Sequence, residues 1–143
     1  MQVAPAGVVI VGGGLAGSLL ALALREQGAT VTLIDPLPAS DALSCSATAM
    51  SYGVLPGWPL ASTPLARLAA RASRQWHRLQ QRHGDLGWRS QQLHLHGANA
   101  ALSAVSRWLP FAQVDTAVLM AGLPLVLAAA GVQSVSARVQ SLA

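Results

Sequence analysis

The hydrophobic pattern near the N-terminus predicts a strand, a helix and a second strand in direct succession. Residues 8–11 are apolar and β-branched without polar alternation, which is typical of a parallel strand buried on both faces. Residues 15–25 are rich in leucine and alanine, which favour a helix, and Gly28 follows at a plausible C-terminal cap. Residues 31–34 are the next apolar run, and Asp35 ends it. This order predicts a βαβ unit with a parallel sheet, and therefore an α/β fold.

A longer helix is expected over residues 64–83. Pro64 suits the first helical position and Gly84 suits the C-terminal cap. One face of this helix is apolar, and another carries five arginines at spacings of four, three, four and four residues: Arg67, Arg71, Arg74, Arg78 and Arg82. Such a stripe can contact the phosphates of RNA. The solvated face of a surface helix is the more common explanation, and no aromatic residues alternate with the arginines to stack on bases.

The segments between this helix and its neighbours are short. Residues 52–59 predict a turn-rich crossing, and residues 86–96 predict one or two short strands. Residues 97–110 are expected to form a linker or a short helix that carries Trp108. His94 and His96 alternate along the predicted strand, but two histidines without a nearby third ligand favour a polar strand face, so no metal site is expected.

The C-terminal part of the chain predicts one more helix and one more strand. Asp115 can cap a helix that runs to about Ala130, with a bend near Pro124. Gly131 suits its end, and residues 132–142 alternate loosely between apolar and polar side chains, as in a strand.

Composition narrows the class of protein. Charged residues make up 10% of the chain and hydrophobic residues 52%, against about 25% and 45–50% in typical soluble domains, which indicates surfaces that are covered. The apolar run before Gly131 is too short and too interrupted to span a membrane. Cys45 is the only cysteine, which excludes an internal disulfide framework and fits a cytoplasmic protein. The net charge of +4 comes from nine arginines and no lysine.

The turn between the first strand and helix carries the most specific motif. Gly12, Gly14 and Gly17 occupy the glycine positions of G-x-G-x-x-G. Gly12 permits the sharp turn, Gly14 leaves room for a pyrophosphate at the backbone, and Gly17 lets the helix pack close to the strand. The free N–H groups of the helix N-terminus then bind phosphate. Asp35, at the end of the second strand, can accept hydrogen bonds from a ribose and would repel a 2′-phosphate, which disfavours NADP.

A segment of small and hydroxyl-bearing residues follows the ribose acid, from Ser44 to Ala49. In a dinucleotide-binding fold this segment returns toward the pyrophosphate, where O–H donors suit a bound cofactor. The residues alone equally allow a small-residue helix that packs closely on the first helix.

Three stretches resemble the N-terminal part of the FAD-dependent oxidoreductases of the D-amino-acid oxidase superfamily, of the glycine and sarcosine oxidase type. They are VVIVGGGLAGSLLALALREQGATVTLID, SCSATAMSYG and VDTAVLMAGLPLVLAAAGVQSVSARVQSL. The resemblance implies a Rossmann-like FAD-binding domain with a parallel sheet, plus part of a small antiparallel substrate-domain segment. It implies a single FAD-binding domain over residues 1–143, with residues 84–113 as a candidate substrate-domain insertion.

The resemblance also implies site residues and chemistry. Asp35 would hold the adenosine ribose, Ser44 and Ser46 would approach the pyrophosphate or the flavin, and Val139 would contact the adenine. The pyrophosphate would lie along the turn formed by Gly12, Gly13, Gly14, Leu15, Ala16 and Gly17. The implied reaction is hydride transfer from the C–N carbon of an amino acid or amine to the flavin of FAD, and the cofactor carries that chemistry.

Members of that family are much longer, and the part that supplies the substrate-binding side chains is missing here. The chain therefore resembles a truncated member, and no catalytic residue is assigned. The implied partners are a small amine or amino acid and either a complementary C-terminal portion or a second copy, with no membrane and little reason to expect nucleic acid. Three alternatives stay open: a non-catalytic nucleotide-binding module, the FAD domain of a tRNA-modifying oxidoreductase, and an NAD-dependent dehydrogenase.

Overall fold

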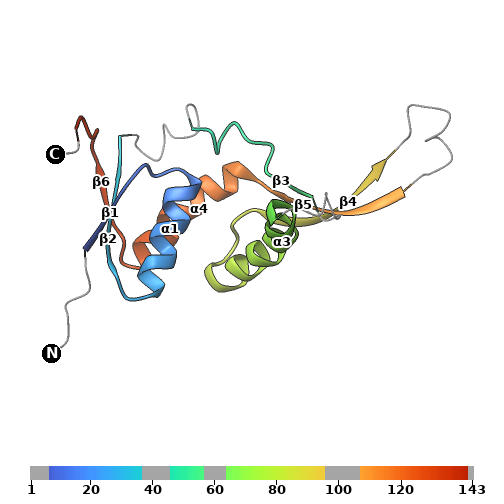
Figure 1. The fold of residues 1–143 in the computed structure, drawn as a ribbon, viewed down its shortest axis with the longest axis horizontal. Helices are drawn as coiled ribbons and strands as arrows, with labels where there is room; N and C mark the ends of the chain where they lie inside the picture. Colours follow the sequence, from blue (N-terminus) through green and yellow to red (C-terminus); the bar gives the residue numbers. More distant parts are fainter. Residues whose placement is uncertain (1–6, 37–45, 57–63, 96–106, 142–143) are drawn as a thin grey trace. The chain divides into compact units, whose positions relative to one another are not determined.

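The computed structural model describes residues 7–36, 46–56, 64–95 and 107–141. The chain divides into two compact units (Figure 1). The first unit combines Met1–Ser51 with Met120–Ala143, and the second is Tyr52–Leu119. The expected insertion, residues 84–113, falls within the second unit.

The first unit is built on a parallel sheet. Its strands are β1 (Gly7–Val11), β2 (Thr30–Asp35) and β6 (Gln133–Ser136), in the order β1-β2-β6. Helix α1 (Leu15–Glu26) connects β1 to β2, and helix α4 (Thr116–Ala129) leads into β6. Both neighbouring strand pairs are parallel. The predicted α/β class and the βαβ unit are therefore confirmed.

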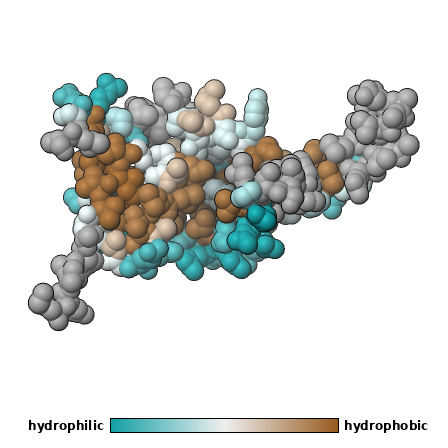
Figure 2. All heavy atoms as spheres, viewed as in Figure 1, coloured by the Kyte–Doolittle hydropathy of each residue, from teal (hydrophilic) through white to brown (hydrophobic). Residues whose placement is uncertain are grey.

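The sheet of the first unit has one buried and one exposed face. Ile10, Val31 and Leu33 are buried, and buried side chains of α1 and α4 complete this core: Ala21, Leu22, Leu123, Val126 and Leu127. Val9 and Val11 alternate with Ile10 and are 62% and 56% exposed. Figure 2 shows a broad apolar surface over this unit, in line with the low charge content of the chain.

The side chain of Arg25 forms hydrogen bonds at the C-terminal ends of both helices of the first unit. Its Nε donates to the carbonyl of Ala130 at 3.0 Å, and its Nη1 donates to the carbonyl of Ala29 at 2.7 Å. These carbonyls lie just beyond the C-termini of α4 and α1, where a cation also complements the helix dipoles. The hydrogen bond from Arg25 to Ala130 thereby connects residues 105 positions apart in the sequence.

The second unit is an antiparallel sheet with one long helix. Its elements are β3 (Val54–Pro56), α3 (Pro64–His83), β4 (Trp88–Leu95) and β5 (Arg107–Val114), and the strand order is β3-β5-β4. The predicted helix over residues 64–83 is confirmed. Gly84 ends it with a φ of 89° and donates its N–H to the carbonyl of Gln80 at 3.0 Å. Buried side chains of this unit include Trp76, Leu86, Ala112 and Val114.

Two predictions about strands were wrong in extent. Residues 107–110, expected in a linker or short helix, begin strand β5, and Pro110 lies opposite Gln92 of β4. The pairing of β5 with β3 ends at Phe111, so Pro110 lies outside the stretch that has two partners, where a missing N–H is better tolerated. The last strand, expected over residues 132–142, ends at Ser136.

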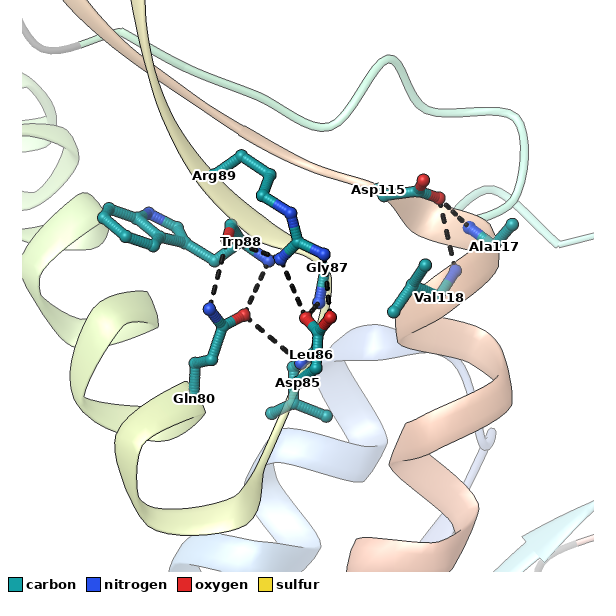
Figure 3. Close-up of polar contacts among 9 residues, drawn as sticks. All are labelled: Gln80, Asp85, Leu86, Gly87, Trp88, Arg89, Asp115, Ala117 and Val118. Atoms are coloured by element: carbon teal, nitrogen blue, oxygen red, sulfur yellow. Dashed lines mark hydrogen bonds and ion pairs between the residues drawn. The ribbon is translucent and has the colours of Figure 1, made fainter.

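The connection from α3 to β4 is held by polar contacts around Gln80 (Figure 3). The Gln80 amide oxygen accepts hydrogen bonds from the N–H groups of Leu86 at 3.3 Å and Trp88 at 2.9 Å, and its nitrogen donates to the Trp88 carbonyl at 3.2 Å. Asp85 and Arg89 form an exposed ion pair at 2.7 Å beside this turn. The side chain of Gln80 therefore fixes the direction in which β4 leaves the helix.

Helix α4 begins at the predicted cap. Asp115 Oδ1 accepts from the N–H groups of Ala117 at 3.0 Å and Val118 at 3.2 Å (Figure 3), as an N-cap carboxylate does. Pro124 lies inside the helix, and Gly131 follows it with a φ of 79°. Within the described ranges, no helix is both long and apolar enough to cross a bilayer.

Candidate dinucleotide-binding site

The turn between β1 and α1 depends on two glycines for different reasons. Gly12 has a φ of 105°, which L side chains rarely adopt, and its N–H donates to the carbonyl of Ile34 at 2.8 Å. A Cβ on Gly17 would lie 1.9 Å from the Gly12 carbonyl oxygen. Only glycine at residue 17 allows the first turn of α1 to lie this close to the end of β1.

Asp35 reaches the same turn from the end of β2. Its carboxylate oxygen Oδ2 accepts a hydrogen bond from the N–H of Gly13. A Cβ on Gly13 would lie 2.9 Å from the Asp35 Cβ. This contact provides a physical reason for glycine at residue 13, which the G-x-G-x-x-G motif leaves open, and it places a carboxylate at the strand-to-helix junction.

Gly14 differs from the other glycines of the turn because neither a positive φ nor a close contact with a described residue requires glycine there. It is the N-cap residue of α1, with a φ of −65° and a ψ of −178°, and it has no side chain to cap the helix. Among the described residues, a Cβ there would meet Thr48 Oγ1 alone, at 3.8 Å, which is an ordinary contact. Packing against the described part of the chain therefore does not require glycine here, and a bound group is a better reason for its presence.

Thr48 is a residue of the site whose role the sequence did not reveal. Its hydroxyl oxygen accepts the N–H of Leu15, the first residue of α1, at 3.1 Å, and the residue is 9% exposed. Residues 46–50 form a turn in which Ser46 Oγ accepts the N–H of Ala49 at 3.0 Å. Residues 46–50 therefore form a turn that brings Thr48 to the N-terminus of α1. The only sequence signal was a hydroxyl among small residues.

The other predicted site residues lie at different distances from the junction. Leu15 and Ala16 open helix α1, and Ser46 starts the turn that carries Thr48. Val139 follows the end of β6 and is half-buried. The segment leading to it stays beside Asp35, whose carbonyl accepts the N–H of Ala137 at 3.1 Å. Ser44 lies outside the described residues.

Comparison with known proteins identifies the family of this chain. Residues 7–121 match the family described as FAD dependent oxidoreductase, abbreviated DAO. The chain belongs to this family. FAD is the cofactor of the DAO family, so the dinucleotide expected at the junction is FAD. No curated protein matches the chain closely enough to count as a relative.

Several solved structures share the fold. The L-amino acid deaminase from Proteus vulgaris aligns with a TM-score of 0.67 at 15% identity, over 93% of this chain and 40% of that one. The L-amino acid deaminase from Proteus myxofaciens, solved with anthranilate, gives 0.67 at 17% identity, over 93% and 38%. Iminodiacetate oxidase from Chelativorans sp. BNC1 gives 0.58 at 19% identity, over 88% and 45%. This chain thus spans less than half the length of these proteins.

The junction fits the adenosine diphosphate half of FAD on chemical grounds. The space at Gly14 admits a pyrophosphate to the backbone, and the N-terminus of α1 favours negative charge. The Thr48 hydroxyl offers a donor beside it, because a hydroxyl that accepts one hydrogen bond can still donate its proton. Asp35 supplies acceptors for ribose hydroxyls.

The histidines and the cysteine of the sequence provide no second candidate site among the described residues. His94 stacks on Trp108 with ring centroids 4.4 Å apart and planes 26° apart, which occupies this histidine in packing along the strand pair. His96 and Cys45 lie outside the described residues. Within the described part of the chain, no three histidine, cysteine, aspartate or glutamate residues come together as metal ligands.

Proposed function

We propose that this chain is the FAD-binding portion of an oxidoreductase that acts on the C–N bond of an amino acid or amine. Membership of the DAO family supports the redox chemistry. The known activities named for two solved neighbours, an L-amino acid deaminase and an iminodiacetate oxidase, support the substrate class. A bound FAD would supply a hydride acceptor for the substrate carbon next to nitrogen, and the protein would orient the reactants.

The proposal rests above all on the position of the Asp35 carboxylate at the Gly13 N–H. From there it would accept hydrogen bonds from the ribose hydroxyls of the adenosine. Backbone N–H groups from Gly12 to Gly17 would hold the pyrophosphate, helped by the positive end of the α1 dipole. These groups need no side-chain cation, which agrees with the absence of arginine from this part of the sequence.

We assign three further contacts to the same cofactor. The Thr48 hydroxyl would keep accepting the Leu15 N–H and direct its proton to a pyrophosphate oxygen. Ser44 and Ser46 would approach the pyrophosphate or the flavin. Val139 would contact the adenine, because its segment leaves the sheet beside Asp35.

Titration with FAD tests this assignment. Flavin fluorescence is measured as protein is added, for the wild-type chain, Asp35→Asn and the matched control Asp85→Asn. The Asp35 variant should bind about tenfold more weakly, because it loses a charge-assisted hydrogen bond worth about 1.4 kcal/mol. The control removes an equal charge from the second unit and should bind normally. Wild-type protein that ignores FAD, or an Asp35→Asn variant that binds as tightly, would refute the site.

A non-catalytic nucleotide-binding module is a second candidate, because the contacts described at the junction concern nucleotide binding and not turnover. Anaerobic addition of glycine, sarcosine, D-amino acids or L-amino acids to the FAD-loaded protein separates the two. Bleaching of the flavin absorbance supports the oxidoreductase, and FAD binding without bleaching supports the module. Mass spectrometry of the released nucleotide distinguishes both from an NAD-dependent dehydrogenase.

A further inference from the structure

Helix α3 carries a continuous positive surface that the proposed FAD site does not use. Five arginines are exposed along it, and we call this surface the arginine face: Arg67, Arg71, Arg74, Arg78 and Arg82. At 100° per residue, their positions fall within an arc of about 80°, and at 1.5 Å per residue they extend over about 22 Å. The result is a narrow straight line of guanidinium groups.

The second unit carries a large excess of positive charge. Helix α3 contains no acidic residue. The second unit has seven arginines and two aspartates, a net charge of +5, whereas the first unit has two arginines against three acidic residues, a net charge of −1. Both aspartates of the second unit have other partners: Asp85 binds Arg89 and the Gly87 N–H, and Asp115 caps α4.

The opposite side of α3 is engaged in packing. Trp76, half a turn away from the arginine line, is 8% exposed, and Gln80 bonds to the start of β4. A helix that lies in a membrane surface inserts its apolar face into the lipid. Here the middle of that face is buried in the protein, so an anionic bilayer is a poor partner.

We propose that the arginine face binds single-stranded RNA through its phosphates. A guanidinium forms paired hydrogen bonds with phosphate oxygens, and successive arginines lie about 4.5–6 Å apart along the helix axis, so one flexible strand can follow the line. A helix inside a duplex groove would instead meet phosphates on both of its flanks. No aromatic side chain lies in the line, so the contact is with the backbone and tolerates any sequence. RNA is the nucleic acid that cells hold single-stranded in quantity.

The salt dependence of binding provides the test. Fluorescence anisotropy of a labelled oligouridine is measured against salt concentration for the wild-type chain and Arg71→Gln/Arg74→Gln/Arg78→Gln. Each phosphate contact to a single strand contributes about −0.7 to the slope of log affinity against log salt. Removing three arginines should make the slope shallower by about 2.1, with at least a tenfold loss of affinity at low salt. Glutamine favours helices, so circular dichroism should stay unchanged.

Controls define what would overturn the proposal. Arg138→Gln removes one exposed arginine from the first unit and should leave the slope unchanged, whereas Arg74→Gln alone should reduce it by about 0.7. Equal binding by the triple variant and the wild-type chain would overturn the proposal. So would tighter binding to duplex RNA than to oligouridine, or arginine-dependent binding to phosphatidylserine vesicles without binding to RNA. The test needs no FAD, so its outcome is independent of the proposed flavin site.

Discussion

Replacing Gly17 with alanine should destabilise the first unit, although alanine is the better helix former. The added Cβ would lie 1.9 Å from the Gly12 carbonyl oxygen and 3.1 Å from the Gly12 carbonyl carbon. Both are backbone atoms, so they cannot move aside as a flexible side chain would. Either α1 must shift away from β1 or the turn must deform.

The magnitude follows from two opposing effects. Forcing an extra carbon into a packed site lowers the free energy of unfolding by about 3 kcal/mol, at the upper end of the usual range. Alanine in place of glycine inside a helix raises it by about 1 kcal/mol. The net loss should be about 2 kcal/mol. For a unit of this size the melting temperature should fall by about 8–16 °C. Differential scanning calorimetry and urea unfolding of the apoprotein measure both quantities.

Gly14→Ala is the matched comparison, because within the described part of the chain its Cβ would meet nothing closer than Thr48 Oγ1 at 3.8 Å. The melting temperature of this variant should stay within a few degrees of wild type, while its affinity for FAD should fall at least tenfold as the methyl group meets the pyrophosphate. The reasoning is refuted if Gly17→Ala melts at or above the wild-type temperature, or if Gly14→Ala unfolds more readily than Gly17→Ala.

Substitutions at three further positions test individual polar contacts. Arg25→Met should lower the free energy of unfolding by about 2 kcal/mol, measured in urea, because two helix-end carbonyls lose a charged donor. Asp115→Ala should lower the free energy of unfolding by about 1 kcal/mol in the same assay, because the α4 N-cap is lost. Asp115→Asn should keep most of the stability, because asparagine can also cap a helix. The hydrogen bond from Arg89, with that from the Gly87 N–H, lowers the pKa of Asp85 from 3.8 to about 2. Any contribution of Asp85 to stability is therefore complete above pH 3.8 and lost as the pH falls through about 2. Arg89→Met should move the carboxyl titration seen by NMR up toward 3.8, and an unmoved midpoint would contradict this cause.

The sequence was most informative where local chemistry decides the structure. Residues 8–35 carry their own strand, turn and helix signals, and the bounds of α3 follow from Pro64 and Gly84. Strand β5 was not predicted because its sequence contains Pro110 and has no clear alternation of apolar and polar residues. The strand is instead stabilised by its pairing with β4. That pairing is non-local information, which periodicity does not carry.

In the candidate site, too, some residues could be predicted from the sequence and others could not. Gly12, Gly17 and Asp35 were identifiable because spacing alone brings them to one junction. Thr48 was not, because its contact with Leu15 depends on how the chain returns after the ribose acid. The contact between Gly13 and Asp35 likewise becomes visible only in three dimensions.

The division of the first unit into two separate stretches of sequence sets the order in which the chain can fold. Strand β2 takes its second neighbour, β6, from residues that follow the second unit in the sequence, so all of the second unit emerges from the ribosome before β6 does. During synthesis the second unit can therefore fold while β2 still has an open edge. Because closing a longer loop adds little entropy cost, the intervening unit delays this sheet far more than it destabilises it.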